Sequence, residues 1–469
     1  HKEYRRQRQM CIRDRMYDEA LTLYDNLTRK APNLAAAFCN RGNVLVKLKR
    51  PEEALKSYSQ AILLKPDYAD VFYFRGVVLE ERNRLDEAFE SYNKAIWIKP
   101  DYIEALNNFG NLLFKQKRFD EAIEYYDRAL AINGEFEYLQ GQRICAKMVS
   151  CNWTNLDKEM ADLSRSVKQG RPSSPPFAFL ALSDSYENYR HVVRAMVKQK
   201  GVKFKDVTFD PSARTHDRIR IAYVSADFRE HPIAQALGSI LELHDRSQFE
   251  IHGIAIGPTD TSKDAQRMIN GCDSFHDMYT KTHEDVGALI KRLEIDILLV
   301  TAVHTEFSNI ELFAERYAPI QVNFLSAWSS GCDFFDYITA DPRCVSESDR
   351  PFFSEKHAAI RGFVSDQAQT ISGEISREDC GLPPGAFVFC SFNEHYKINP
   401  AMFDSWMRIL ARVEGSVLWL KHTPESVERL RAEAKKRKID PNRLIFATRL
   451  PAISHHFARL HHADLMLDT

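Results

Sequence analysis

The chain has 469 residues, too many for a single hydrophobic core, so we expect two to four domains. Its 64 Lys and Arg residues balance 65 Asp and Glu residues, which argues against a nucleic-acid-binding or membrane-surface protein. Nine Cys residues without a C-x-x-C pair, and no apolar run approaching the roughly 18 residues of a membrane helix, predict a cytoplasmic protein with reduced thiols.

The first 15 residues, HKEYRRQRQMCIRDR, are polar and rich in Arg, and they lack the apolar segment of a signal peptide. An Arg-rich transit segment and an unrelated chain end both fit this composition. Counting back from Gly42 by one period of the repeat described next leads to Arg8, which does not match it. We therefore expect residues 1–15 to be foreign to the repeat array and the leading repeat to be cut.

Residues 16–139 repeat with a period of 34, and Pro32, Pro66 and Pro100 mark the unit boundaries. The same spacing relates four further columns: Gly42, Gly76 and Gly110; Ala20, Ala54, Ala88 and Ala122; Tyr24, Tyr58, Tyr92 and Tyr126; Ala61, Ala95 and Ala129. This is the tetratricopeptide signature, in which each unit is a pair of antiparallel helices. Gly and Ala let the two helices of a unit approach closely, and we expect Tyr to fill the space between units. The predicted fold of this region is an α solenoid.

A solenoid of this kind has a concave groove that usually holds an extended peptide or a partner protein. Packing alone explains the Gly, Ala and Tyr columns. Exposed Asn residues on the first helices are better binding candidates, because Asn can hydrogen-bond a peptide backbone of any sequence. We expect Asn108 and Asn111 to contact an acceptor peptide, with Asn40, Asn43 and Asn107 at comparable places.

Residues 140–216 are predicted to form a helical linker, interrupted by a loop or hinge at GRPSSPP, residues 170–176. Residues 217–350 change to short apolar runs separated by helical segments. Strands are expected at 218–225, 249–257, 296–301 and 320–325, with a crossover helix at 283–293. This alternation predicts a first lobe with a mostly parallel, covered sheet.

A connector, residues 351–382, is expected to lead to a second α/β lobe, residues 383–469. Its strands are predicted at 387–391, 416–420, 443–447 and 463–468, and its helices at 402–413, 424–437 and about 453–462. Neither lobe contains G-x-G-x-x-G or G-x-x-x-x-G-K-[ST]. The sequence therefore does not support a dinucleotide oxidoreductase or a P-loop enzyme.

Residues 387–400, FVFCSFNEHYKINP, carry the first candidate for chemistry. Lys397 follows the expected buried strand and precedes the expected helix. Open α/β sheets bind ligands at this carboxyl edge, so Lys397 is a candidate phosphate-binding residue. The alternative is a surface lysine in a loop.

The motifs of the chain, taken together, resemble a known family. After the repeats come IAYVSADFREHPIA, YAPIQVNFL, DFFDYITAD, FSEK, VFCSFNEHYKINPAMFDSWMRIL, GSVLWL and ADLMLDT. In this order they resemble the O-linked N-acetylglucosamine transferase family, which includes the SPINDLY-like protein O-fucosyltransferases, from about residue 16 onward. The resemblance implies a two-lobed glycosyltransferase of the GT-B type that is inverting, uses no metal or cofactor, and modifies Ser or Thr of proteins bound in the repeat groove. Its donor would be UDP-GlcNAc or a related nucleotide sugar.

The resemblance assigns two residues of the first lobe. His231 matches the active-site His of the family's D-F-x-x-H-P motif, and its titration range suits proton handling near neutral pH. A capping or packing role is the alternative reading of this His. Thr305 matches the Thr of the family's N-G-[HY]-T motif, near the donor sugar.

In the second lobe, Lys397 matches the Lys that neutralises the donor pyrophosphate, where a fixed cation stabilises the charge of the leaving nucleoside diphosphate. His456 and Arg459 match the family's H-x-x-R helix, in which the His stacks on the base and the Arg helps to hold the nucleotide. At i and i+3 both would face one side of the helix. The adjacent His455 leaves the first assignment open by one residue.

The chain departs from the family in the loop at residues 324–331. FLSAWSSG stands where the family has W-L-G-Y-P-G-T-S-G, one residue longer and richer in Gly. Because Gly lets backbone amides approach a ligand, we expect Ser326 and Trp328 to crowd or reshape the sugar pocket.

Further departures lie in the second lobe. Glu394 replaces the usual Gln and places a carboxylate near the expected phosphates, and Ala452 or Ile453 stands where family members carry a Lys. Thr469 ends the sequence before the family's H-T-T segment. We therefore expect the second lobe to be incomplete and a chain that ends there to be inactive.

Two functions of different classes fit these observations. The first is a nucleotide-sugar-dependent protein O-glycosyltransferase, favoured by His231, Lys397, His456 and Arg459. The second is a non-catalytic tetratricopeptide scaffold with a degenerate transferase domain, favoured by the altered sugar loop. In either case we expect protein partners and no nucleic-acid or membrane partner.

Overall fold

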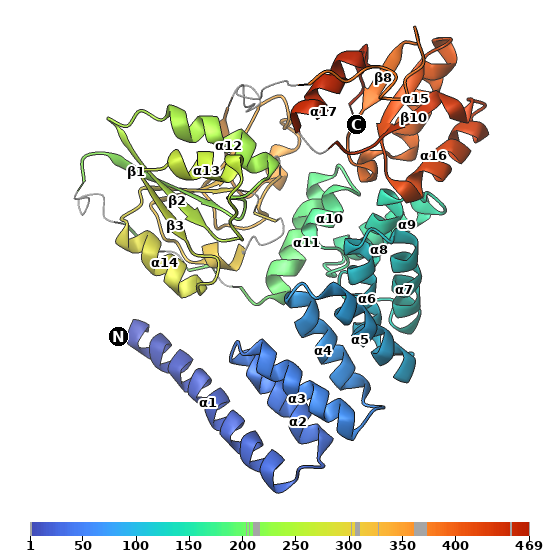
Figure 1. The fold of residues 1–469 in the computed structure, drawn as a ribbon. Coiled ribbons are helices and arrows are strands. Elements are labelled where there is room, and N and C mark those ends of the chain that lie inside the picture. The colour runs from blue at the N-terminus through green and yellow to red at the C-terminus, as the bar shows by residue number, and fades with distance from the viewer. Residues whose placement is uncertain are drawn as a thin grey trace. The chain divides into compact units, whose positions relative to one another are not determined.

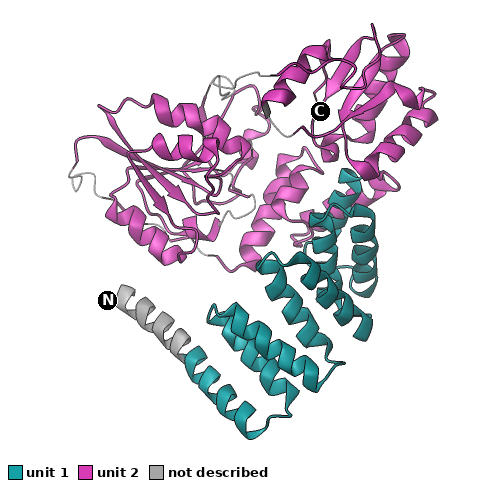
Figure 2. Ribbon diagram, viewed as in Figure 1, with its two compact units in different colours: residues 1–150 teal, residues 151–469 magenta. Residues whose placement is uncertain are grey.

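The computed structural model divides the chain into two units, residues 1–150 and residues 151–469 (Figure 2). It describes residues 2–202, 204–205, 207–209, 216–301, 303–304, 310–326, 328–360, 373–450 and 453–468, with side chains from residue 16 onward and without that of Ile453. No helix in these ranges is both long and apolar enough to cross a membrane.

The first unit is built from consecutive helices (Figure 1). They are α1 (Lys2–Lys30), α2 (Ala35–Lys47), α3 (Pro51–Leu64), α4 (Ala69–Glu81), α5 (Leu85–Ile98), α6 (Ile103–Lys115), α7 (Phe119–Ile132) and α8 (Leu139–Val149). The pairs α2 with α3, α4 with α5 and α6 with α7 pack as helical hairpins. The prediction of an α solenoid of two-helix repeats is confirmed.

The Gly and Tyr columns form one contact that recurs in each hairpin. A Cβ atom on Gly42 would lie 2.3 Å from Tyr58 Cε1, and one on Gly110 would lie 2.5 Å from Tyr126 Cε1. Gly76 faces Tyr92 in the same way, at 2.7 Å. The three rings are almost fully buried. The Tyr column therefore fills space within a unit, and our expectation that it lies between units was wrong.

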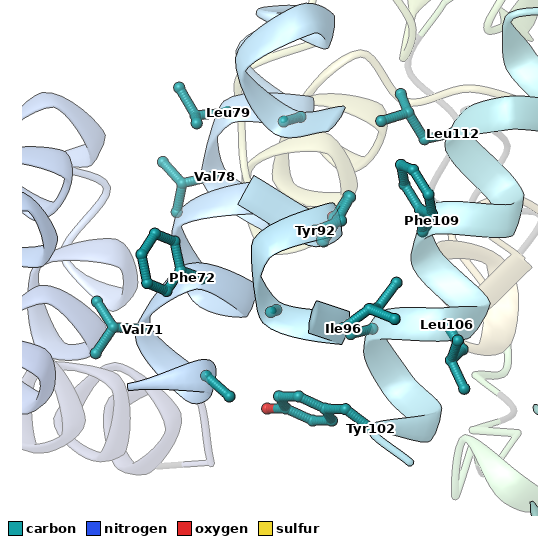
Figure 3. Packing of buried hydrophobic residues seen from close by; sticks show 14 of the residues in the cluster. Val71, Phe72, Val78, Leu79, Tyr92, Ile96, Tyr102, Leu106, Phe109 and Leu112 are labelled. Atoms are coloured by element: carbon teal, nitrogen blue, oxygen red, sulfur yellow. The ribbon is translucent and has the colours of Figure 1, made fainter. Parts of the chain in front are cut away.

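Other aromatic and aliphatic side chains join neighbouring hairpins. Phe89 on α5 packs against Phe109 on α6 with ring centroids 4.7 Å apart, and Tyr73 on α4 packs against Tyr102 at 5.1 Å. Figure 3 shows Ile96, Tyr102, Leu106 and Phe109 within this shared core. Because the core continues from one hairpin to the next, each unit depends on its neighbours for burial of its apolar face.

Three helices of the predicted linker belong to the second unit: α9 (Leu156–Lys168), α10 (Pro176–Leu180) and α11 (Tyr186–Gln199). Residues 169–175 between α9 and α10 are not helical, as the sequence GRPSSPP predicted. Trp153 packs on Phe403 of the second lobe at 5.4 Å, whereas Tyr189 of α11 packs on Trp328 of the first lobe at 5.2 Å. Linker residues from 151 onward thus pack on both lobes of the second unit.

The first lobe contains a seven-stranded, entirely parallel sheet in the order β3-β2-β1-β4-β5-β6-β7. The strands are β1 (Ile219–Ser225), β2 (Phe249–Ala255), β3 (Ser274–Asp277), β4 (Ile297–Thr301), β5 (Ile320–Phe324), β6 (Tyr337–Ala340) and β7 (Lys356–Ala359), and the helices between them are α12 (Pro232–Leu243), α13 (Lys263–Asn270) and α14 (His283–Arg292). The strand β7 lies in the segment predicted as a connector between the lobes, residues 351–382. The predicted boundaries of that connector stay a prediction.

The second lobe contains a four-stranded parallel sheet in the order β10-β9-β8-β11. Its strands are β8 (Val388–Ser391), β9 (Val417–Lys421), β10 (Leu444–Ala447) and β11 (Leu465–Met466), and its helices are α15 (Pro400–Arg412), α16 (Pro424–Lys436) and α17 (Ile453–Arg459). In both sheets the first strand of the lobe lies between its second and fourth. A sheet of this topology offers a ligand site outside the carboxyl ends of the first and fourth strands, where the strand order reverses.

Candidate functional site

The carboxyl edge of the second sheet carries the predicted Lys397. The chain leaves β8 at Ser391 and forms a short 3₁₀ turn, His395–Lys397, before α15. Asn399 caps α15 because its Oδ1 accepts from the Met402 backbone N–H at 2.8 Å. On the other side, Asn393 Nδ2 donates to Asp468 Oδ1, just beyond β11, at 3.2 Å. The turn with Lys397 therefore lies at the strand-order reversal of the sheet.

Lys397 itself is exposed, and no described residue forms a hydrogen bond or an ion pair with its ammonium group. His395, two residues earlier, is buried and fully bonded. Its Nε2 donates to the carbonyl of Lys421 at 2.7 Å, and its Nδ1 contacts Ser426 Oγ at 2.5 Å. Burial lowers the pKa of His395 to about 4, so the ring is neutral at physiological pH. A buried neutral His thus holds the turn that presents Lys397 to solvent.

Glu394, which stands where the family usually has Gln and places a carboxylate near the expected phosphates, has a cation beside it. Its Oε1 forms an ion pair with Lys421 Nζ, at the end of β9. Both side chains are substantially exposed. Lys421 escaped the sequence analysis because it lies far from Glu394 in the chain, and only the pairing of β8 with β9 brings the two together.

Arg459 is a buried cation without a carboxylate partner among the described residues. It is 7% exposed, and its Nη1 donates to the Thr448 carbonyl at 2.6 Å. Its guanidinium lies 4.7 Å from the ring centroid of Phe392 and 5.9 Å from that of Trp419. Burial lowers the pKa of this guanidinium. A cation placed in this way attracts an anionic ligand, because no fixed anion compensates its charge.

His456 lies beside Arg459, as the i, i+3 spacing predicted. Arg459 Nη2 donates to His456 Nδ1 at 2.7 Å, which places the ring proton on Nε2, and the His456 ring packs on Phe392 at 5.4 Å. Burial, followed by the charge of Arg459, lowers the pKa of His456. His455 instead faces Gly373, where an added Cβ would lie 2.7 Å from His455 Cδ2. Of the two histidines, His456 is the one beside Arg459.

The carboxyl edge of the first sheet carries His231 at the start of α12. Its Nδ1 accepts from the Ile233 backbone N–H at 3.2 Å, so the ring caps the helix. The same Nδ1 lies 3.5 Å from Oδ2 of Asp227, which is 2% exposed and also contacts Arg229 Nη2 at 3.2 Å. Burial lowers the pKa of His231, and Asp227 opposes this shift. The capping role is present, and with Nδ1 as the acceptor the neutral ring carries its proton on Nε2.

Neighbouring strand ends in this lobe bond to each other. Thr301 Oγ1, at the end of β4, donates to Ser225 Oγ, at the end of β1, at 2.8 Å. His304 Nε2 donates to the Ser330 carbonyl at 3.1 Å, and burial lowers the pKa of His304 to about 4.

Three residues named in the sequence analysis cannot be placed in the site. Thr305 and Ala452 lie outside the described residues, as does the side chain of Ile453.

The altered loop after β5 is held by a buried glutamate that the sequence analysis did not single out. Glu355, 5% exposed, accepts from Ser329 Oγ at 2.6 Å and from the Ser330 backbone N–H at 2.7 Å. Ser326 Oγ donates to the Trp328 carbonyl at 2.8 Å, and the Trp328 ring packs on Tyr186 at 4.7 Å. Trp328 therefore packs against α11. The predicted effect of this loop on a sugar pocket stays a prediction.

The predicted acceptor residues lie on α6, the first helix of its hairpin. Asn111 Oδ1 accepts from the Tyr126 hydroxyl at 2.8 Å, which fixes the amide, and no described residue accepts from its NH₂ group. Asn108 Nδ2 donates to Tyr73 Oη at 3.4 Å. The Tyr partner of Asn111 is the one that fills the space beside Gly110.

These observations define a helical repeat array joined to a two-sheet α/β unit with cations at one ligand-binding edge. The family model described as glycosyl transferase family 41 matches residues 188–373 and 366–469, and tetratricopeptide repeat models match residues 39–103 and 103–136. The transferase match covers more than half of the chain, and the chain belongs to glycosyl transferase family 41.

Three relatives support this assignment. A probable UDP-N-acetylglucosamine–peptide N-acetylglucosaminyltransferase, SEC, of Arabidopsis thaliana is 32% identical over 262 residues, 54% of this chain and 27% of the relative. A UDP-N-acetylglucosamine–peptide N-acetylglucosaminyltransferase of Caenorhabditis elegans is 25% identical over 460 residues, 68% of this chain and 39% of the relative. The probable transferase SPINDLY of Petunia hybrida is 24% identical over 275 residues, 56% of this chain and 29% of the relative. The chain thus spans less than half of the length of these relatives.

A mutant O-GlcNAc transferase of Thermobaculum terrenum has a similar solved structure. Its TM-score is 0.60 at 20% sequence identity, over 94% of this chain and 79% of that chain. This similarity concerns the fold alone, and it agrees with the predicted repeat array followed by an α/β transferase domain.

Proposed function

We propose that this chain carries the donor-binding and proton-handling residues of an inverting protein O-glycosyltransferase that transfers GlcNAc from UDP-GlcNAc to Ser or Thr. The observation that carries the proposal is the cationic edge of the second sheet. There Arg459 is buried without a carboxylate partner among the described residues, and Lys397 is exposed without one. The names of the relatives supply the donor and the peptide acceptor.

Transfer requires that the bond between the sugar and the diphosphate breaks while the acceptor oxygen attacks from the opposite face. Negative charge then grows on the leaving UDP, and Lys397 and Arg459 are the cations placed to stabilise it. The Phe392 ring packs against both His456 and Arg459 and so fixes the position of α17. These two side chains of α17 would then contact the nucleotide.

The acceptor hydroxyl must lose a proton as it attacks. We assign this proton to Nε2 of His231, in the tautomer whose Nδ1 carries the ring proton and donates to Asp227 Oδ2, 3.5 Å away. In that tautomer Nδ1 no longer accepts from the Ile233 N–H, so the helix cap is released. In the repeat array, the free NH₂ of Asn111 would donate to a backbone carbonyl of the acceptor, with Asn108 beside it.

Metal independence and a cytoplasmic location are parts of the same proposal. Among the described residues, no group of three or more His, Cys, Asp or Glu side chains is arranged to hold a metal ion. The eight described cysteines are free, which suits a reducing compartment.

The second candidate function, a non-catalytic scaffold, is favoured by the loop after β5. Trp328 and Ser329 stand where the family has a Gly-rich segment. The Trp328 ring packs on Tyr186, and Ser329 Oγ donates to Glu355. A chain of this kind would bind acceptor proteins without donor.

Nucleotide binding separates the two functions. We expect UDP to bind the wild-type chain in isothermal titration calorimetry, and Lys397→Met to abolish this binding while the thermal unfolding midpoint is unchanged. Lys435→Met is the matched control, because Lys435 is an exposed residue in the last turn of α16, at the opposite edge of the sheet. It should leave the UDP affinity unaltered.

A transfer assay completes the test. The protein, extended to include the family's H-T-T segment, is incubated with labelled UDP-GlcNAc, UDP-glucose or GDP-fucose and a cell lysate, and we expect label from UDP-GlcNAc to appear on protein. No transfer from any donor, together with no thermal shift on adding UDP or GDP, would refute the enzyme and leave the scaffold.

A further inference from the structure

The ion pair between Glu394 and Lys421 joins two segments that emerge side by side at the ligand edge. Ser391 pairs with Leu420 in the parallel register of β8 and β9, so the residues that follow each strand leave the sheet at the same edge. His395 fixes this arrangement, because its Nε2 donates to the backbone carbonyl of Lys421 at 2.7 Å. The Lys421 side chain is therefore held next to the turn that carries Lys397.

Breaking this ion pair should cost the folded protein little stability. The Lys421 and Glu394 side chains are 37% and 53% exposed, and ion pairs exposed to this degree contribute little net stability. A diphosphate carries more negative charge than a carboxylate and offers several acceptor oxygens to an ammonium group. Where both compete for one lysine, the diphosphate is the stronger partner.

We propose that Lys421 is a third diphosphate-binding cation, held by Glu394 in the free protein and transferred to the diphosphate when a nucleotide binds. This inference rests on the proposed function. Once Lys421 leaves it, Glu394 faces the phosphates as an uncompensated carboxylate and lowers their affinity. Glu394 is then a residue that weakens retention of the nucleoside diphosphate product.

Three single substitutions and one double variant, Glu394→Gln with Lys421→Met, test this exchange in the intact chain. Glu394→Gln removes the competing carboxylate and should tighten UDP binding about tenfold, with a smaller gain for UMP and none for uridine. Lys421→Met should weaken UDP binding about tenfold, and Lys421→Arg should preserve it. In the double variant, Glu394→Gln should gain less than it does alone, because part of its effect is the release of Lys421. The thermal unfolding midpoint of each variant checks that the fold is retained.

The outcomes separate this inference from the proposed function. If UDP binds and Lys397→Met abolishes binding, but Lys421→Met has no effect, Lys421 is not a phosphate ligand and the inference is wrong. Equal gains from Glu394→Gln for UDP and uridine would also overturn it, because the effect would not concern phosphate. If the wild-type chain binds no UDP, the proposed function fails and this inference fails with it.

Discussion

The two sheet edges share a topology and differ in charge. At the first edge the polar groups bond to one another: Thr301 donates to Ser225, and Arg229 donates to Asp227. At the second edge, Arg459 is a cation with no carboxylate partner among the described residues. The strand order fixes where a ligand can bind, and the side chains at the strand ends decide which chemistry occurs there.

This comparison predicts a division of tasks. The second edge should bind phosphate through charge, whereas the first edge should handle a proton through a neutral His. Substitutions at the second edge should then change nucleotide affinity, and substitutions at the first edge should leave it unchanged.

The largest effect is expected at Arg459. Arg459→Met should weaken UDP binding about 100-fold, because it removes a buried cation that contacts the diphosphate. This loss corresponds to about 3 kcal/mol of binding free energy. The same change should leave the free protein as stable or more stable, because it removes an uncompensated buried cation. Calorimetric titration and thermal unfolding measure the two quantities. Arg459→Lys keeps the charge but cannot reach His456 and Thr448 together, and it should give an intermediate affinity.

If Arg459→Met instead destabilises the free protein strongly and leaves UDP affinity unaltered, the guanidinium serves the fold through Phe392 and Trp419. The two edges would then not differ in the way proposed.

The second effect concerns the buried His395 beneath Lys397. Its pKa falls from 6.5 to about 4 on folding, so between these values the unfolded chain binds more protons than the folded one. Stability from this residue is complete above about pH 6.5 and is lost as the pH falls toward 4, by about 2 kcal/mol between pH 7 and pH 5. Urea unfolding at the two pH values measures it, and His395→Gln should reduce the difference. An equal pH dependence in both proteins would contradict the prediction.

The smallest effect is expected at the first edge. His231→Ala should lower the free energy of unfolding by about 1 kcal/mol, because α12 loses its cap, whereas His231→Asn should retain the cap. Neither change should alter UDP affinity, while both should abolish transfer if His231 takes the acceptor proton. A loss of UDP affinity in His231→Asn would show that the edges are not independent.

Much of the fold could be predicted because its signals are local or periodic. The repeat columns fix helical hairpins, and the apolar runs fix the main strands. Three short strands were missed: β3, β6 and β7 have the sequences SFHD, YITA and KHAA, which lack a continuous apolar run. The Tyr column was misplaced because a period gives the spacing of residues and not the surface that each one faces.

The candidate site divides in the same way. Lys397, His456 and Arg459 belong to continuous motifs, so the sequence could place them at strand and helix ends. Lys421 and Glu355 could not be found, because their partners Glu394 and Ser330 are joined to them only by strand pairing and loop packing.

The contact between Gly and Tyr in the repeats bears on how such an array changes during evolution. Gly42 and Tyr58 belong to one 34-residue unit, as do Gly76 and Tyr92. An in-frame duplication or deletion of one unit therefore carries both halves of the contact with it and leaves no glycine without its ring. The number of repeats can therefore vary in small steps while the second unit stays the same.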